Sequence, residues 1–156
     1  MAIGERIKRI RNLRRLTQRD LGRAIGFDEN TADVRIAQYE TGTRTPKEKY
    51  VNALAAALQV TPYSLSVPDI ESYVGVLHTL FALEDNYGLK INSIDGEICL
   101  SLDKHTGITF LSMFDMFSAW QREAERLKNG EISQSDYDNW RYNFPKSEME
   151  RSQGDT

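Results

Sequence analysis

The side chains that most often carry nucleophilic, acid–base or metal chemistry are scarce in this sequence. It contains one cysteine, Cys99, and two histidines, His78 and His105, and their spacing matches neither a zinc site nor a nucleophile–base pair. The sequence also has no phosphate-cradling glycine loop and no paired-carboxylate motif. We therefore expect no enzyme, no metal ion and no cofactor. We interpret Cys99 as a strand residue, His78 as a packed or partly exposed helix residue, and His105 as a turn residue.

The chemistry that the sequence does offer is electrostatic. Residues 1–68 contain 12 lysines and arginines against 7 acidic residues, a balance of +5, whereas residues 69–156 contain 8 against 16, a balance of −8. The net charge of −3 therefore conceals a basic half. Because nucleic acid responds to the local field of one face, the basic half is a candidate surface for double-stranded DNA.

The basic half must be built from short helices, because its apolar residues recur at helical spacing. Thr17 and Asp20 form a capping-box pattern at the start of the second helix. Thr31 is the expected start of the third helix, and Pro46 and Pro62 suit the first turns of the fourth and fifth. The expected helices cover roughly residues 3–14, 18–25, 31–40, 46–58 and 62–65.

Pro68 marks a domain boundary, because it interrupts the helical pattern where the charge changes sign. Beyond it we expect a helix over about 70–86, a hairpin turning at Asp95-Gly96, a long helix over about 110–127 and a last helix capped by Ser133 or Ser135. A lone hairpin is marginal in water, so neighbouring helices should cover its apolar face. The expected domains are residues 1–67 and 68–146, with a disordered polar tail over 147–156.

Residues 16–46 carry two linked patterns. The first is Leu16-Thr17-Gln18-x-x-Leu21-Gly22-x-Ala24-Ile25-Gly26, and the second is Ile36-x-x-Tyr39-Glu40-x-Gly42-x-Arg44-x-Pro46. They resemble the helix-turn-helix of the lambda-repressor-like, or xenobiotic-response-element (XRE), family of transcriptional regulators, over about residues 3–66. The resemblance implies a five-helix lambda-repressor-like DNA-binding domain, and together with the hairpin pattern beyond Pro68 the sequence predicts a mainly α fold in which this domain is followed by a small α+β domain with one β-hairpin. The resemblance also implies a sequence-specific DNA-binding transcriptional regulator.

The resemblance assigns roles to individual residues. It implies that Arg11 pairs with Glu40 to orient the recognition helix. Among the base-contact positions, a Gln at 38 suits adenine N6 and N7, and an Arg at 35 suits guanine or phosphate. The base-contact candidates are Asp33, Val34, Arg35 and Gln38. The phosphate-contact candidates are Gln18, Arg19, Thr43 and Arg44, and the helix dipole independently favours an anion beside Gln18.

The sequence departs from the family between the second and third helices. The stretch 27–33 is about four residues longer than the usual turn. Either the loop bulges before an ordinary recognition helix, or that helix gains a turn at its N-terminus. In the second case Asn30 and Thr31 would also reach DNA.

The second domain is the expected dimerisation element, because pairing two small DNA-binding modules is the usual route to useful affinity. The family resemblance suggests a repressor, and it suggests that this repressor controls genes of a mobile element or prophage. The alternatives are an antitoxin-like protein whose residues 69–146 bind a partner protein, and a sensor whose aromatic residues line an effector pocket. We expect a cytoplasmic protein, because no apolar run is long enough for a membrane and the N-terminus lacks a secretion signal.

Overall fold

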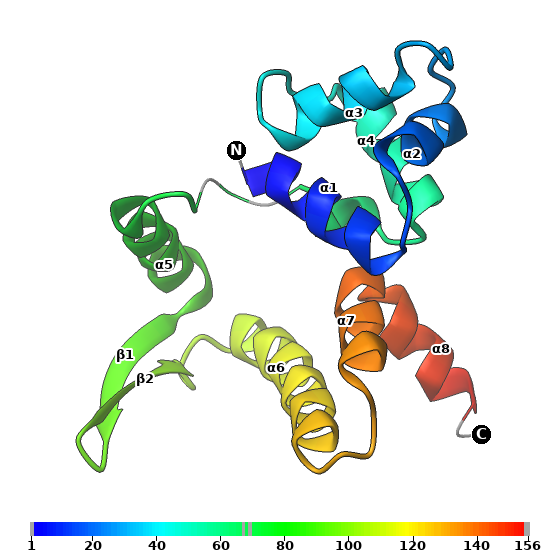
Figure 1. The fold of residues 1–156 in the computed structure, drawn as a ribbon. Coiled ribbons are helices and arrows are strands. Elements are labelled where there is room, and N and C mark those ends of the chain that lie inside the picture. The colour runs from blue at the N-terminus through cyan, green and yellow to red at the C-terminus, as the bar shows by residue number, and fades with distance from the viewer. Residues whose placement is uncertain (1, 67, 69, 155–156) are drawn as a thin grey trace. The chain divides into compact units, whose positions relative to one another are not determined.

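The computed structural model describes residues 2–66, 68 and 70–154 (Figure 1). Their contacts divide them into two compact units. Unit 1 contains the described residues up to 68 together with those from Ser133 onward, and unit 2 runs from Ile70 to Ile132. The fold is mainly helical with one two-stranded sheet, as the sequence predicted.

Unit 1 begins with five short helical segments, which confirms the predicted helical N-terminal part. They are α1 (Ala2–Leu13), α2 (Gln18–Ala24), α3 (Ala32–Glu40), α4 (Glu48–Leu58) and the 3-10 turn η1 (Pro62–Ser64). Two details differ from the prediction. Pro46 is buried two residues before α4 rather than forming its first turn, and the fifth helix is a single 3-10 turn.

The longer connection between α2 and α3 is a loop, not an extension of the recognition helix. Helix α3 begins at Ala32, so Asn30 and Thr31 lie outside it and are exposed. Asp28 shapes the loop, because its Oδ1 accepts the N–H of Asn30 at 3.0 Å and its carbonyl accepts the N–H of Thr31 at 3.0 Å. The first of the two sequence-based alternatives therefore describes the structure.

The core of unit 1 is a set of aliphatic side chains from α1 to η1. Those with the least exposure are Ile7, Ile10, Leu21, Ile36, Leu54, Leu58 and Leu65. Two glycines allow the helices around α3 to approach closely. A Cβ at Gly22 would lie 2.6 Å from the carbonyl oxygen of Ala32, and one at Gly4 would lie 2.4 Å from that of Tyr39. The backbones of α1 and α2 therefore both pack closely against α3.

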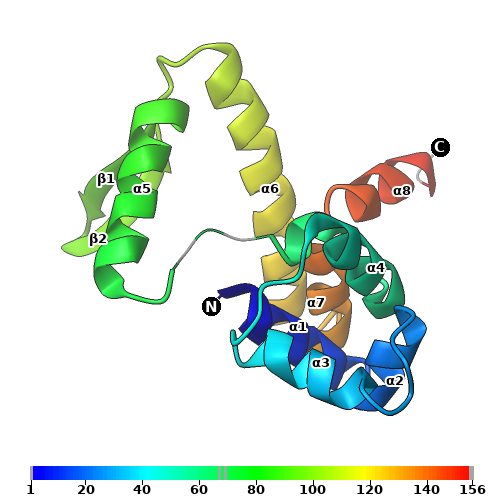
Figure 2. The ribbon, with the colours of Figure 1, turned by 90° about the horizontal axis from the view of Figure 1, so that it is seen from above.

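The domain boundary predicted at residue 146 differs from the structure. Helix α7 (Gln134–Asn143) packs on unit 1, where Tyr142 is 2% exposed within the core (Figure 2). The N–H of Thr61 donates to the Tyr142 carbonyl at 3.0 Å, and Arg14 of α1 donates to the Asn139 side chain at 2.5 Å. An amphipathic helix does not specify which core covers its apolar face, so the sequence pattern grouped α7 with its neighbours in the chain.

The C-terminal tail also differs from its prediction. Residues 147–156 were expected to be disordered, but α8 runs from Lys146 to Gly154. Residues 155–156 lie outside the described part of the chain. The polar composition that suggested disorder is that of a solvent-exposed helix.

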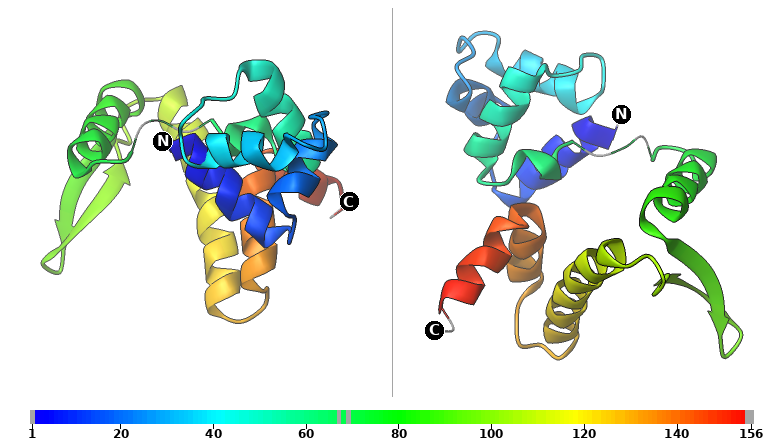
Figure 3. Two further views of the ribbon diagram at one scale, coloured as in Figure 1. Left: turned by 45° about the horizontal axis from the view of Figure 1, so that its top comes forward. Right: turned by 180° about the vertical axis from the view of Figure 1, so that it is seen from behind.

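Unit 2 contains α5 (Tyr73–Tyr87), the antiparallel strands β1 (Leu89–Ile94) and β2 (Glu97–Leu102), and α6 (Ile108–Lys128). The predicted hairpin is confirmed. Asp95 and Gly96 have φ of 51° and 86°, the geometry that an Asp-Gly turn favours. Ile91 pairs with Leu100, and the hairpin projects beyond α5 (Figure 3).

Among the described residues, the expected covering of the hairpin's apolar face does not occur. Ile91 and Ile98 are 68% and 79% exposed, and of the twelve strand residues only Leu89 is buried. Helix α5 contains no buried residue. No helix among the described residues is both long enough and apolar enough to span a membrane.

Candidate nucleic-acid interface

The C-terminal end of α3 is fixed by a buried carboxylate with three donors. Arg11 of α1 donates from Nε to Glu40 Oε1 at 2.6 Å and from Nη2 to Oε2 at 3.2 Å, and Gln18 Nε2 of α2 donates to Oε2 at 2.8 Å. Only 3% of the Glu40 side chain and 12% of the Arg11 side chain are exposed. A further bond runs from Arg11 Nη1 to the Leu16 carbonyl at 2.8 Å. This Glu40 network joins α1, α2 and α3 into one rigid group.

The start of α2 is defined by a complete capping box. The Thr17 hydroxyl accepts the N–H of Asp20 at 3.0 Å, and Asp20 Oδ2 accepts the N–H of Thr17 at 3.1 Å. Hydrogen bonds from the Thr17 side chain and then from its backbone hold the pKa of Asp20 below its ordinary value of 3.8. Gln18, the first residue of α2, therefore has a fixed position beside the capped terminus.

Two of the four predicted base-contact residues on α3 have partners within the protein. Asp33 Oδ2 accepts from Arg19 Nη2 at 3.1 Å. The pKa of Asp33 is lowered first by the N–H of Val34, which donates at 2.9 Å, and then by Arg19. The guanidinium of Arg35 lies 5.2 Å from the centre of the Phe27 ring.

The other two base-contact candidates remain on the outer side of α3. Val34 is 54% exposed, and Gln38 is half-buried one helical turn farther along. Residues at i and i+4 lie on the same face of a helix. Val34 and Gln38 therefore form one continuous strip, which we call the α3 outer face.

The loop after α3 carries the predicted phosphate-contact residues Thr43 and Arg44, both exposed. The N–H of Arg44 donates to the Gln38 carbonyl at 3.0 Å, and the hydroxyls of Thr41 and Thr43 lie 3.0 Å apart. The loop is thus tied back onto the last turn of α3. Thr43 and Arg44 therefore come three and four residues after the end of α3, and their side chains are exposed.

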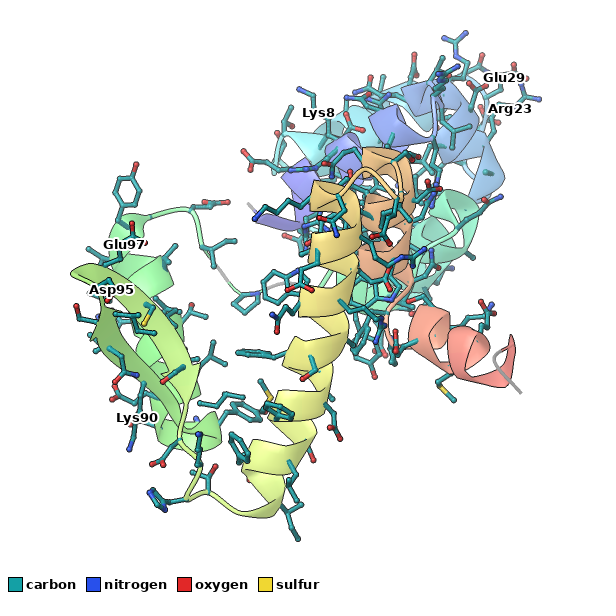
Figure 4. All side chains as sticks on the ribbon, turned by 90° about the horizontal axis from the view of Figure 1, so that it is seen from below. Lys8, Arg23, Glu29, Lys90, Asp95 and Glu97 are labelled. Atoms are coloured by element: carbon teal, nitrogen blue, oxygen red, sulfur yellow. The ribbon has the colours of Figure 1, made fainter. Side chains whose placement is uncertain are left out.

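Sequence reasoning missed two contacts. One is the bond from Gln18 to Glu40, for which the motif gives no signal beyond the presence of both residues. The other is Phe27, whose ring supports Arg35 and lies 5.1 Å from the ring of Tyr50. Phe27 is an aromatic residue at the start of an otherwise polar loop, and that contrast was the available signal. Arg23 of α2 and Glu29 of the loop lie beside each other, with Arg23 Nη1 3.5 Å from Glu29 Oε1 (Figure 4).

The single cysteine and the two histidines occupy ordinary structural positions. Cys99 is a half-buried strand residue, His78 packs edge-on against Phe81, and the N–H of His105 donates to Asp103 in a turn. Among the described residues, no group of three or more His, Cys, Asp or Glu side chains could hold a metal ion.

Residues 7–65 match the family described as "Helix-turn-helix", a span that begins inside α1 and ends directly after η1. No curated protein and no solved structure matches the chain.

Proposed function

We propose that this chain, whose residues 7–65 form an XRE-type helix-turn-helix domain of a DNA-binding transcription regulator, is a dimeric repressor that binds a specific operator. The observation that carries the proposal is the Glu40 network. It fixes the angle of α3 against α1 and α2 while Val34 and Gln38 remain on the outer face. A recognition helix needs this combination of rigid support and a free face.

Base reading is assigned mainly to Gln38 and Val34. The Gln38 amide can bond adenine N6 and N7 together, and Val34 can contact a thymine methyl group. Arg35 and Asp33 are secondary candidates, because contacting a base would require Arg35 to leave Phe27 and Asp33 to leave Arg19.

Phosphate binding is assigned to the two ends of the motif. Thr43 and Arg44 follow α3 and are exposed, and Gln18 lies at the capped start of α2. Gln18 already donates one N–H to Glu40, so its second N–H is the one free for phosphate. The Arg19 guanidinium would add a positive charge next to Gln18. Such contacts position the protein without reading sequence.

Dimerisation is assigned to unit 2. Among its described residues, the only buried hydrophobic side chains are Leu89 and Ala119. A self-contained domain of about 60 residues buries roughly 60% of its surface, so a unit this open needs a partner. The exposed apolar side chains of unit 2 lie on one face of the hairpin, on α5 and at the start of α6. The most exposed of them are Tyr73, Val74, Ile91, Ile98, Ile108 and Leu111.

A second copy is the partner that suits this surface and the proposed function together. Two copies would bury the same apolar face against itself and would present two DNA-binding domains to a two-fold symmetric site. The two domains would share the phosphate contacts that one small module cannot supply alone. The partner-protein alternative rests on the same exposed face, and the oligomeric state of the purified chain separates the two.

The test is selection of bound sequences from a random duplex pool by the full-length protein at near-physiological salt. We expect a palindromic consensus whose half-sites lie about one helical turn apart. An enriched single half-site would contradict the dimer, and the absence of any enriched sequence would contradict specific binding.

The repressor assignment has its own test. Transcription in vitro from a promoter that overlaps the selected site should fall as the protein is added, since occupancy alone blocks polymerase. A rise in transcript would show an activator instead. A variant with Gln38→Ala, added at the same concentration, controls for nonspecific coating of the template.

A further inference from the structure

An ion pair joins the first turn of α2 to the first turn of α3. Arg19, the second residue of α2, donates from Nη2 to Asp33 Oδ2 at 3.1 Å. The other oxygen, Asp33 Oδ1, accepts the N–H of Val34 at 2.9 Å. These two bonds, that from Val34 first, hold the pKa of Asp33 below its ordinary value of 3.8, so its carboxylate is charged at neutral pH.

The two residues of this pair belong to helices with different tasks in a helix-turn-helix. The first helix of the motif crosses the DNA backbone, and the N-terminal residues of the second contact base edges in the major groove. Arg19 on α2 is therefore placed to meet a phosphate, and Asp33 on α3 is placed to meet a base. The ion pair connects a group that can only position the protein with a group that can read sequence.

The Arg19–Asp33 pair is open to water, unlike the pair of Arg11 and Glu40. The exposed fraction is 56% for the Arg19 side chain and 37% for that of Asp33, whereas the side chains of Arg11 and Glu40 are largely buried. Exposed ion pairs contribute little to stability, so exchanging one partner for another costs little. A DNA phosphate can therefore take Arg19 from Asp33 without disturbing the support of α3.

Once Arg19 has left, the Asp33 carboxylate needs another hydrogen-bond donor. In the major groove, cytosine offers only the N4 amino group, whereas guanine offers two acceptors and thymine offers one. Adenine offers an amino donor but places its N7 acceptor beside it. Cytosine is therefore the base that best satisfies the carboxylate, and the acceptors of guanine and thymine would leave it unpaired.

We propose that the Arg19–Asp33 pair couples backbone contact to base reading, so that Arg19 moves to a phosphate only where Asp33 meets a cytosine amino group. On other sequences the pair stays closed, and Arg19 adds nothing to binding. Asp33 is then a specificity-determining residue, which acts through its own contact and by withholding Arg19. This inference rests on the proposed function of specific operator binding and adds one determinant of the operator to it.

The test is the binding of full-length variants to two fluorescein-labelled duplexes of equal length, the selected site and a random sequence, by anisotropy at several salt concentrations. Arg19→Gln should reduce the slope of log affinity against log salt by about 1 per bound domain on the selected duplex, because one phosphate contact is lost. On the random duplex, where the pair is closed, the slope should not change.

Arg23→Gln is the matched control for Arg19→Gln. The Arg23 side chain is also 56% exposed and also belongs to α2, and it pairs with Glu29. Glu29 lies in the loop before α3, outside the recognition helix. The effect of Arg23→Gln on the salt slope should therefore be the same for the selected and the random duplex.

Asp33→Ala should have the opposite effect, because Arg19 becomes free for phosphate on every sequence. The salt slope on the random duplex should steepen by about 1 per domain, and adding Arg19→Gln should reverse this change. Preference for the selected duplex should fall roughly 10- to 100-fold, and a repeated selection should lose one cytosine from each half-site. Glu29→Ala, which removes an equal charge and frees Arg23, should leave this preference unchanged.

A second variant keeps the test decisive if Asp33→Ala disturbs the start of α3. Asp33→Asn retains an oxygen for the N–H of Val34 and removes only the charge. It should steepen the salt slope on the random duplex as Asp33→Ala does, since the release of Arg19 depends on the charge alone. An unchanged slope in both variants would overturn the proposal.

Two further results for Arg19→Gln would overturn the coupling. An equal loss of slope on both duplexes would show that Arg19 contacts phosphate on any sequence, and no loss on either would show that it stays on Asp33 in the complex. If the wild type discriminates between the duplexes and Asp33→Ala discriminates equally well, this inference fails while the proposed function stands. A wild type that binds both duplexes equally would overturn the proposed function and this inference with it.

Discussion

Glu40 is a carboxylate removed from water, and its environment explains why a charged residue can end the buried face of α3. Three donors from two other helices satisfy it, and its side chain is 3% exposed. A buried pair of this kind adds little net stability compared with apolar residues, but removing one partner leaves an uncompensated charge. The network therefore determines the position of α3 more than it determines the free energy of unfolding.

Arg11→Met should lower the free energy of unfolding by about 3–5 kcal/mol, because Glu40 would remain buried with one donor residue. Urea denaturation followed by circular dichroism measures the loss. The double variant Arg11→Met with Glu40→Met should recover most of it, since both charges are then gone. Arg9→Met, at an exposed position of the same helix, should change stability by less than about 0.5 kcal/mol. A loss below about 0.5 kcal/mol for Arg11→Met would show that the Arg11–Glu40 pair is not needed for stability.

Gln38→Ala should reduce discrimination between the selected site and random DNA by roughly 1–3 kcal/mol, because a bidentate adenine contact would be lost. Arg44→Ala is the contrast, since loss of a phosphate contact weakens binding to all sequences and flattens the salt dependence. Fluorescence anisotropy on both duplexes at several salt concentrations separates the two effects. Unchanged specificity in Gln38→Ala would place base reading elsewhere on α3.

At the scale of elements, the arrangement of α2 and α3 depends on close backbone contact. The position of Gly22 leaves no room for a Cβ, which would lie 2.6 Å from the Ala32 carbonyl oxygen. Replacing a glycine by alanine in an exposed helix interior stabilises the helix by about 1 kcal/mol. A substitution of Gly22 by alanine that lowers stability would therefore report the close packing of α2 and α3.

Gly22→Ala should destabilise unit 1 by roughly 1–3 kcal/mol, because α2 and α3 must move apart to admit the methyl group. The same movement should weaken binding to the selected site. Thermal unfolding and anisotropy measure the two consequences. Increased stability, as helix propensity alone predicts, would show that the two helices separate without cost.

The capping box of α2 gives a prediction with a pH dependence. Thr17→Ala should cost about 1 kcal/mol at neutral pH. Because hydrogen bonds from Thr17 lower the pKa of Asp20 in the folded state, the ionised carboxylate contributes stability above its ordinary pKa of 3.8. That contribution is lost as the pH falls through the lower, folded-state value. The difference between wild type and Thr17→Ala should therefore shrink in this acid range.

Thr31→Ala is the matched control for the capping box, because Thr31 precedes α3 but makes no side-chain capping bond. Its effect at neutral pH should be smaller, and urea denaturation at several pH values compares the two variants. Equal losses at all pH values would exclude a contribution from the Asp20 carboxylate.

At the scale of the whole molecule, the two units differ in charge and in burial. Unit 2, residues 70–132, contains 10 acidic and 5 basic residues, whereas unit 1, residues 1–69 and 133–156, contains 15 basic and 13 acidic residues. Unit 1 has a core of its own, but the apolar side chains of unit 2 are largely exposed. An acidic unit with an open apolar face suits a contact between protein copies better than contact with DNA.

Ile98→Asp should weaken self-association at least about tenfold, since burying a charge in an apolar interface is strongly unfavourable. Analytical ultracentrifugation over a range of concentrations measures the change. Asn92→Asp introduces the same charge on the polar face of the hairpin and should leave association unchanged. A monomeric wild type would contradict the dimer, and equal association of both variants would exclude the apolar face as the interface.

Local signals in the sequence determined most of the elements. Thr17 with Asp20 and Ser133 with Asp136 form capping boxes in the structure, and Asp95-Gly96 forms the predicted turn. Each signal acts between residues at most four apart, so neighbours in the chain are sufficient to define it. The helix-turn-helix motif was recognisable for the same reason, because its residues lie close together in the sequence.

Only the tertiary structure decided which surfaces meet. Helix α7 packs within unit 1, where Tyr142 lies in the core and its ring lies beside Arg6 from the other end of the chain. The same holds for Gln18 with Glu40 and for Arg35 with Phe27. An amphipathic face requires burial but does not name its partner, so contacts between distant segments depend on the shape and charge of the complete fold.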